Sequence, residues 1–157
     1  MQPFTRVTAL MGMSSCLTLS AQADLPIQSF EASCDAWGIP AVCTSVWSEG
    51  LSPHLHVQDY RIAHADTGDT IFAGRGVYRV DGEDVTGYWE DSQGNIHRLT
   101  GSWLDGALEV TWGETDTPVG KSRYEFSDDG MSAEDWSVTA NDWQSFMTVS
   151  YPANDAN

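Results

Sequence analysis

Residues 87–112 read GYWEDSQGNIHRLTGSWLDGALEVTW, and their pattern of turns and alternating side chains is typical of a β-sheet. Two turn signals, DSQGN and LDG, separate three short segments that are rich in aromatic and β-branched residues. Asp, Asn and Gly favour turns because they tolerate left-handed or turn-bonded backbone. In ALEVTW, Leu108, Val110 and Trp112 alternate with polar residues, which is the period of a strand with one buried face. The stretch therefore predicts antiparallel strands joined by tight turns.

The same punctuation continues along the rest of the chain. Turn signals separate strand-like segments at about 55–64, 71–80, 85–90, 96–103, 107–113, 121–127, 131–138 and 143–151. Short connections make successive strands antiparallel neighbours. With one or two earlier strands, the sheet is too long to remain open, because closure removes its exposed edges. The sequence therefore predicts an all-β fold, an up-and-down antiparallel β-barrel of about eight to ten strands. The glycines at 74, 76, 87 and 101 fit close packing in a curved sheet.

The first 23 residues are typical of a secretory signal peptide. Arg6 provides a positive start, a short apolar stretch follows, and Ala21-Gln22-Ala23 resembles a cleavage site. We therefore expect a cleaved segment, 1–23, and a single β-barrel domain, 24–157, that is exported to the periplasm or the exterior. Lipoprotein anchoring through Cys16 is an alternative that the sequence leaves open.

Cys34 and Cys43 form an even pair in a chain predicted to be exported, which indicates a disulfide. The expected strands near 27–32 and 44–48 leave a short loop that this bond would close. A brief helical turn at 36–39, ended by Pro40, is one interpretation of the loop. Closing so small a loop stabilises the fold by roughly 2–3 kcal/mol on the chain-entropy model.

The charge of the chain limits its partners. Twenty-three Asp and Glu residues against seven Lys and Arg give a net charge of −16. A surface of this sign repels phosphate backbones, so nucleic acid is not expected as a partner. No stretch after the signal-like segment is long and apolar enough to predict a membrane-spanning helix. The acidic surface also leaves open a scaffold or interaction module, and the oligomeric state is not predicted.

Three motifs resemble an uncharacterised bacterial family of exported calycin-like proteins, the lipocalin-like barrels. A Y-W-x-D-S-x-G hairpin, a G-x-x-R-Y strand and a closing W-x-x-F-M-x-x-x-Y stretch carry the resemblance. They correspond here to Tyr88, Trp89, Asp91, Ser92 and Gly94; to Gly120, Arg123 and Tyr124; and to Trp143, Phe146, Met147 and Tyr151. The likeness covers about residues 70–151 and implies a barrel with an interior cavity. It implies no set of catalytic residues.

Aromatic residues are the strongest indication of a binding role. The chain has seven Trp, five Tyr and five Phe, enough to line a cavity for a small, partly apolar ligand. The residues expected to line it are Tyr88, Trp89, His97, Trp103, Trp112, Tyr124 and Trp143. Alternatively, the aromatic residues fill the interior, and the barrel is a scaffold without a cavity. On the predicted hairpin at 87–103, Trp89 is expected on one face, and His97, Leu99 and Trp103 share a face after the turn.

Two residues suggest a metal site. His54 and His56 are two positions apart, so on a strand both imidazoles would face the same side and could share a zinc or copper ion. This supports a less favoured alternative, a metal-assisted periplasmic enzyme. The sequence contains no nucleophile elbow, P-loop or dinucleotide fingerprint, and no cofactor is predicted. Asp91 is interpreted as a turn former, so the prediction leans away from an enzyme.

Overall fold

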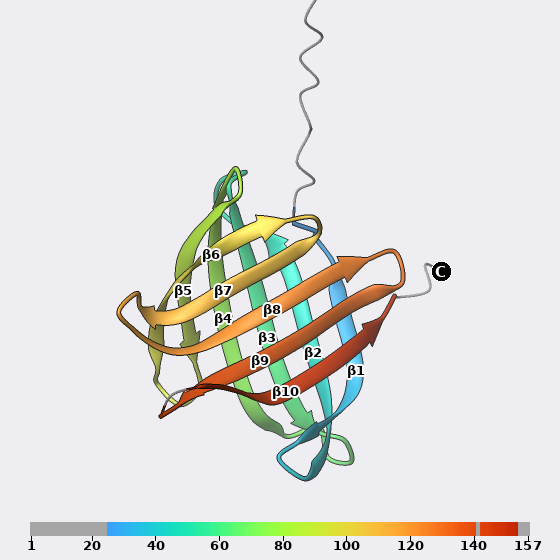
Figure 1. The fold of residues 1–157 in the computed structure, drawn as a ribbon. Coiled ribbons are helices and arrows are strands. Elements are labelled where there is room, and N and C mark those ends of the chain that lie inside the picture. The colour runs from blue at the N-terminus through green and yellow to red at the C-terminus, as the bar shows by residue number, and fades with distance from the viewer. Residues whose placement is uncertain (1–24, 141, 154–157) are drawn as a thin grey trace, which may run out of the picture.

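The computed structural model describes residues 25–140 and 142–153. Ten β-strands make up most of these residues (Figure 1). The strands are β1 (Ser29–Ala36), β2 (Ile39–Glu49), β3 (Leu55–His64), β4 (Thr70–Asp81), β5 (Asp84–Asp91), β6 (Ile96–Leu104), β7 (Ala107–Glu114), β8 (Thr117–Ser127), β9 (Gly130–Thr139) and β10 (Asp142–Pro152). The signal-like segment and Cys16 lie outside the described residues, so export and cleavage remain predictions.

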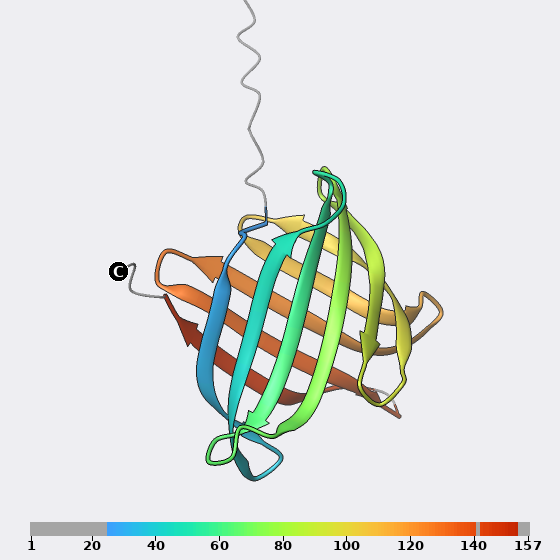
Figure 2. The same cartoon turned by 180° about the vertical axis from the view of Figure 1, so that it is seen from behind.

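The ten strands form one sheet in chain order, and each strand is antiparallel to the next. The sheet curls until β1 and β10 lie side by side, which makes a nearly closed barrel (Figures 1 and 2). At this seam Phe30 packs against Tyr151 with ring centroids 6.2 Å apart. The prediction of an up-and-down barrel of eight to ten strands is confirmed. The described residues contain no helix long and apolar enough to cross a membrane.

The period-two alternation directs side chains as expected. Leu108 and Val110 on β7 are buried, while Glu109 between them reaches the outer surface. On the hairpin of β5 and β6, Leu99 and Trp103 are buried and Tyr88 is 43% exposed. One strand departs from the pattern. A β-bulge between Ser145 and Met147 shifts the register of β10, so Trp143 and Met147 do not share a face as strict alternation would place them.

The N-terminal segment is a β-hairpin, with longer strands than the sequence suggested. β1 and β2 pair down to Ala36 and Ile39, so the expected helical turn at 36–39 is wrong. Trp37 and Gly38 both adopt positive φ, at 56° and 87°, as a two-residue hairpin turn requires. The predicted disulfide is confirmed: Cys34 and Cys43 bridge the two strands with Cα atoms 5.9 Å apart.

Aromatic rings fill one end of the barrel. Trp47 stacks on Tyr78 at 5.3 Å and meets Tyr124 edge-on at the same distance. Phe126 packs against Trp47 at 5.4 Å and against Trp103 at 5.8 Å. Trp47 and Trp103 are at most 3% exposed. We call this end the filled half, defined by Trp47, Tyr78, Val85, Leu99, Trp103 and Phe126.

Two glycines permit close approaches between β4 and β5. A Cβ at Gly74 would collide with the indole ring of Trp89, so glycine lets that ring lie flat against β4. A Cβ at Gly87 would collide with the backbone carbonyl of Val77 on the neighbouring strand. Both positions therefore require glycine for space, in agreement with the close packing expected from the sequence.

Candidate ligand cavity

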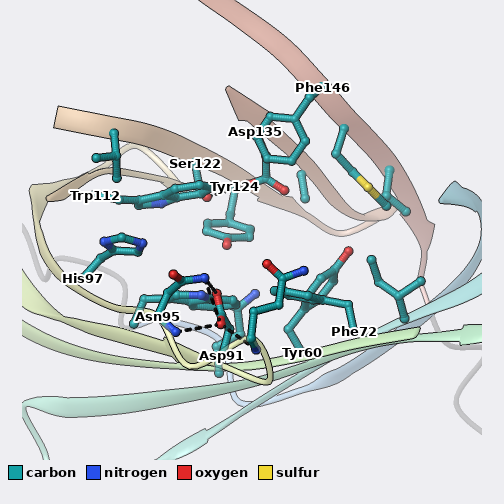
Figure 3. Close-up of a pocket in the computed structure, with 18 of the residues that line it drawn as sticks. Tyr60, Phe72, Asp91, Asn95, His97, Trp112, Ser122, Tyr124, Asp135 and Phe146 are labelled. Atoms are coloured by element: carbon teal, nitrogen blue, oxygen red, sulfur yellow. Dashed lines mark hydrogen bonds between the residues drawn. The ribbon is translucent and has the colours of Figure 1, made fainter. Parts of the chain in front are cut away.

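A cavity of about 350 Å³ occupies the barrel interior beyond the filled half (Figure 3). Trp37 from the β1–β2 turn and Gln93 and Asn95 from the β5–β6 turn belong to its lining. Turns of this kind gather at one end of an up-and-down barrel, so the cavity opens at that end. We call the region from this opening to the filled half the hollow half. Its volume lies at the small end of the range for ligand pockets, roughly 300–1,000 Å³.

Aromatic rings form two walls of the hollow half. On one side, Phe72 and Trp89 lie nearly parallel, with centroids 6.5 Å apart and planes inclined by 13°. Tyr60 contacts both rings at 6.2 and 6.4 Å. On the opposite side, Trp112 meets Phe146 at 6.3 Å (Figure 3). The gap between the walls is completed by aliphatic side chains from Ile62, Val119, Ala133, Met147 and Val149.

A hydrogen-bonded chain closes the inner end of the cavity. The Tyr78 hydroxyl donates to Gln58 Oε1 at 2.7 Å, and Gln58 Nε2 donates to Ser45 Oγ at 3.0 Å. All three residues are at most 1% exposed. Burial raises the pKa of Tyr78 and of the neighbouring Tyr124, so both phenols stay neutral at physiological pH. The inner end therefore offers neutral polar groups to the cavity.

The most unusual polar group in the lining is Asp135. It lies on the inward face of β9, and its carboxylate points into the cavity (Figure 3). Burial raises the pKa of Asp135 from 3.8 to about 6; the hydrogen bond from Ser122 opposes this rise, and the charge of Glu134 adds to it. Among the described residues no Lys, Arg or His forms a salt bridge with Asp135. The cavity thus contains a carboxylate that is ionised at neutral pH and has no cationic partner.

Two further phenols lie near this carboxylate. Its charge and burial both raise the pKa of Tyr60 and of Tyr151, with burial the larger cause. The Tyr60 hydroxyl donates to Cys43 Sγ at 3.6 Å, which is a weak interaction. The Tyr151 hydroxyl is near that of Tyr60, but it has no partner at full hydrogen-bond geometry although the residue is 2% exposed. A hydroxyl oxygen has two acceptor positions, so beyond its contact with Tyr60 this oxygen can accept a further hydrogen bond.

A tight turn between β5 and β6 forms part of the rim of the cavity opening. Asp91 Oδ1 accepts hydrogen bonds from the backbone N–H groups of Gln93 at 2.9 Å and Asn95 at 3.1 Å. Burial alone would raise the pKa of Asp91, but these bonds and one from the Asn95 side chain lower it overall. The structure therefore agrees with the interpretation of Asp91 as a turn former.

The seven residues predicted from the sequence to line the cavity fall into three groups in the structure: lining the cavity, packed in the filled half, or on the outer surface. Trp89, His97, Trp112 and Tyr124 line it together. Trp103 also points inward, but it belongs to the filled half. His97 and Trp103 are six residues apart on one strand, roughly 20 Å at the usual rise, so they occupy opposite ends of the barrel.

Tyr88 and Trp143 lie outside the cavity. Tyr88 sits on the outer face of β5, between Gly87 and Trp89, and is 43% exposed. Trp143 is 38% exposed and lies 5.3 Å from Lys121 Nζ. The bulge in β10 accounts for the position of Trp143, because it reverses the faces of the residues that precede it.

Sequence reasoning missed Tyr60, Phe72 and Asp135. The signal for Asp135 was present in MSAEDW, where Met131, Ala133 and Asp135 share one face of a strand. An aspartate that continues an apolar face is a buried charge, which is rare without a partner. Tyr60 follows His56 and Gln58 on the inward face of β3, a mixed face that alternation alone does not identify as buried.

The two histidines of the suggested metal site, His54 and His56, lie in different surroundings in the structure. His54 precedes β3 and is exposed, whereas His56 is 6% exposed and faces the interior at the other end from the cavity. Among residues 25–140 and 142–153, no three His, Cys, Asp or Glu side chains come together in a way that could hold a metal ion. The geometry therefore provides no third ligand for this pair.

Compared with protein-family models and with curated proteins, the chain matches none of them. The cavity and its chemistry are therefore the basis for any assignment of function.

Proposed function

We propose that this protein is an exported, calycin-like barrel that binds a small, partly apolar molecule in the hollow half. The observation that carries the proposal is the cavity of about 350 Å³ with aromatic walls inside a barrel whose other end is packed. Most ligand pockets combine an apolar lining with a few convergent polar groups, and this cavity has both. The signal-like segment and the Cys34–Cys43 disulfide support the part of the proposal that concerns export.

A neutral fluorescent probe tests whether the cavity accepts a ligand. N-phenyl-1-naphthylamine becomes bright in apolar surroundings, and we expect saturable binding with one molecule per chain. The variant Ala133→Phe places a ring in the cavity from β9, and it should weaken binding by at least about tenfold while the barrel remains folded.

Val46→Phe is the matched control, because Val46 is 38% exposed on the outer face of β2. It adds the same ring outside the cavity and should leave probe binding unchanged. Absence of saturable binding to the folded wild type, or equal weakening by both variants, would overturn the proposal. Circular dichroism of each variant establishes that it is folded.

A further inference from the structure

We infer that the ligand is an organic cation, a small aromatic or aliphatic body that carries a protonated amine and pairs with Asp135. The inference rests on the proposed function and names the class of molecule that the cavity takes. It follows from the charge of the lining, from the free acceptor positions of Asp135 and from the aromatic walls.

The charges around the cavity favour a cation. The described lining residues include two carboxylates, Asp91 and Asp135, and no Lys or Arg. Asp91 has its oxygens occupied within the β5–β6 turn, whereas Asp135 receives one hydrogen bond, from Ser122. An anionic ligand would meet uncompensated negative charge in a poorly solvated space, where such repulsion is strong. The net charge of −16 attracts cations to the whole molecule as well.

The hydrogen-bonding groups around Asp135 match an ammonium group. A carboxylate accepts about four hydrogen bonds, so Asp135 retains free acceptor positions on the cavity side. Tyr151 provides a second acceptor, because its buried hydroxyl oxygen has an acceptor position beyond its contact with Tyr60. The charge of Asp135 raises the pKa of the Tyr60 and Tyr151 phenols, which places both within its electrostatic range. An ammonium carries three donors and no acceptor, so it complements this set of oxygens.

The aromatic walls suit the remainder of such a ligand. The faces of Trp and Tyr rings also attract a cation that lies within about 6 Å of the centroid, so the walls suit both the charged end and the apolar body of the ligand. Phe72 and Trp89 present a nearly parallel pair of rings on one wall, and Trp112 lies on the other. An apolar body between these walls would bury its surface while its amine reached Asp135. The same cavity thus binds both parts of an amphiphilic amine.

Three indole compounds of similar size separate charge from shape. Tryptamine, tryptophol and indole-3-propionate share the ring and differ in an ammonium, a hydroxyl or a carboxylate at the end of a short arm. Isothermal titration at pH 7.5 should show tryptamine binding at least about tenfold tighter than the other two, because a hydrogen bond between two charged groups is stronger than one to a neutral hydroxyl. Equal affinities, or preference for the acid, would overturn the inference.

Asp135→Asn removes the charge and keeps the shape. It should weaken tryptamine at least about tenfold and leave tryptophol unchanged. Asp59→Asn is the matched control, because Asp59 pairs with Arg75 on the outer face and its loss changes the net charge equally. It should leave tryptamine binding unchanged. Equal weakening by both variants would show a general charge effect and overturn the role of Asp135.

The pH dependence of tryptamine affinity tests the charge of Asp135 directly. A purely structural role of this residue would not make the affinity depend on its protonation. Wild-type affinity for tryptamine should fall about tenfold from pH 7.5 to pH 5, as Asp135 takes up its proton, and should stay flat in Asp135→Asn. The phenols of Tyr60, Tyr124 and Tyr151 stay neutral over this range. His97 and Asp91 at the opening, and Glu134 beside Asp135, remain in the variant, so the variant measures their contributions separately. An equal fall in both proteins would overturn the assignment.

These outcomes distinguish the two proposals. If N-phenyl-1-naphthylamine binds but tryptamine has no advantage, the cavity is a binding site and the inferred ligand class is wrong. If neither the probe nor any of the three indoles binds to the folded protein, both proposals fail.

Discussion

The filled half and the hollow half are built from the same strands and the same alternation, yet they differ in density. In the filled half, Trp47, Tyr78 and Phe126 come from three different strands and meet in the middle of the barrel. In the hollow half, the inward positions of β8 and β9 are small, at Ser122 and Ala133, and the rings opposite them have nothing to meet. The size of the side chains that face each other across the barrel therefore determines which part of its interior is empty.

Removing a ring from the filled half should cause the largest loss of stability. Trp47→Ala should lower the free energy of unfolding by about 3–5 kcal/mol, because the indole is 1% exposed and contacts three other rings. Trp89→Ala in the hollow half should cost about 1–2 kcal/mol, since one side of its ring already faces the cavity. Urea unfolding of both variants gives the comparison. Equal losses would mean that the two halves are equally well packed.

The second prediction concerns how the stability of the protein depends on pH through Asp135, which lies in the hollow half. Because the pKa of Asp135 is raised from 3.8 to about 6, the native state binds more protons than the unfolded state between these values. Stability should therefore fall as the pH rises through this window, by about 2–3 kcal/mol. We expect the fall in wild type and not in Asp135→Asn, as measured by urea unfolding between pH 4 and pH 7.5. Parallel profiles would contradict it.

The disulfide joins β1 and β2 beside the hollow half, although neither cysteine lines the cavity. Replacing both Cys34 and Cys43 by Ala should cost about 2–3 kcal/mol, mainly because the unfolded chain regains freedom. Thermal unfolding with and without a reductant checks this, and the double variant should no longer respond to the reductant. Binding of N-phenyl-1-naphthylamine should persist in the folded variant, since neither cysteine lines the cavity. Loss of probe binding would show that the hairpin also shapes the opening.

Removing the exposed ring of Trp143 should have the smallest effect, because this ring lies outside the hollow half. Trp143→Ala should cost less than about 1 kcal/mol, because the ring lies outside and contributes an exposed cation–π contact with Lys121. Probe affinity should not change, whereas Trp112→Ala should weaken it. Urea unfolding and probe titration of the two variants provide the test. Weakened binding in Trp143→Ala would place that ring at the cavity.

Much of this structure could be predicted because alternation and turn residues are local signals. They identified the strands, the alternation of side chains along the β5–β6 hairpin and the turn at Asp91, but not which face of that hairpin points inward. The position of Trp143 could not be predicted, because a one-residue bulge leaves no clear mark in the sequence. The Trp37–Gly38 turn was missed because a tryptophan rarely adopts positive φ.

The cavity was harder to predict because its existence depends on residues far apart in the chain. Trp103 and Trp112 have similar surroundings in the sequence, yet Trp103 meets Phe126 and Trp112 borders empty space. Which of them is packed depends on the side chains that other strands bring across the barrel. Asp135 alone had a local signal, since it continues the apolar face of Met131 and Ala133.

The even number of strands has a practical consequence. β1 begins and β10 ends at the end of the barrel opposite the cavity opening. A tag or surface linkage attached before Leu25 or after Ala153 would therefore hold the molecule with its opening toward the solution. An immobilised layer of this protein, prepared through either terminus, would present every cavity to a flowing sample in the same orientation.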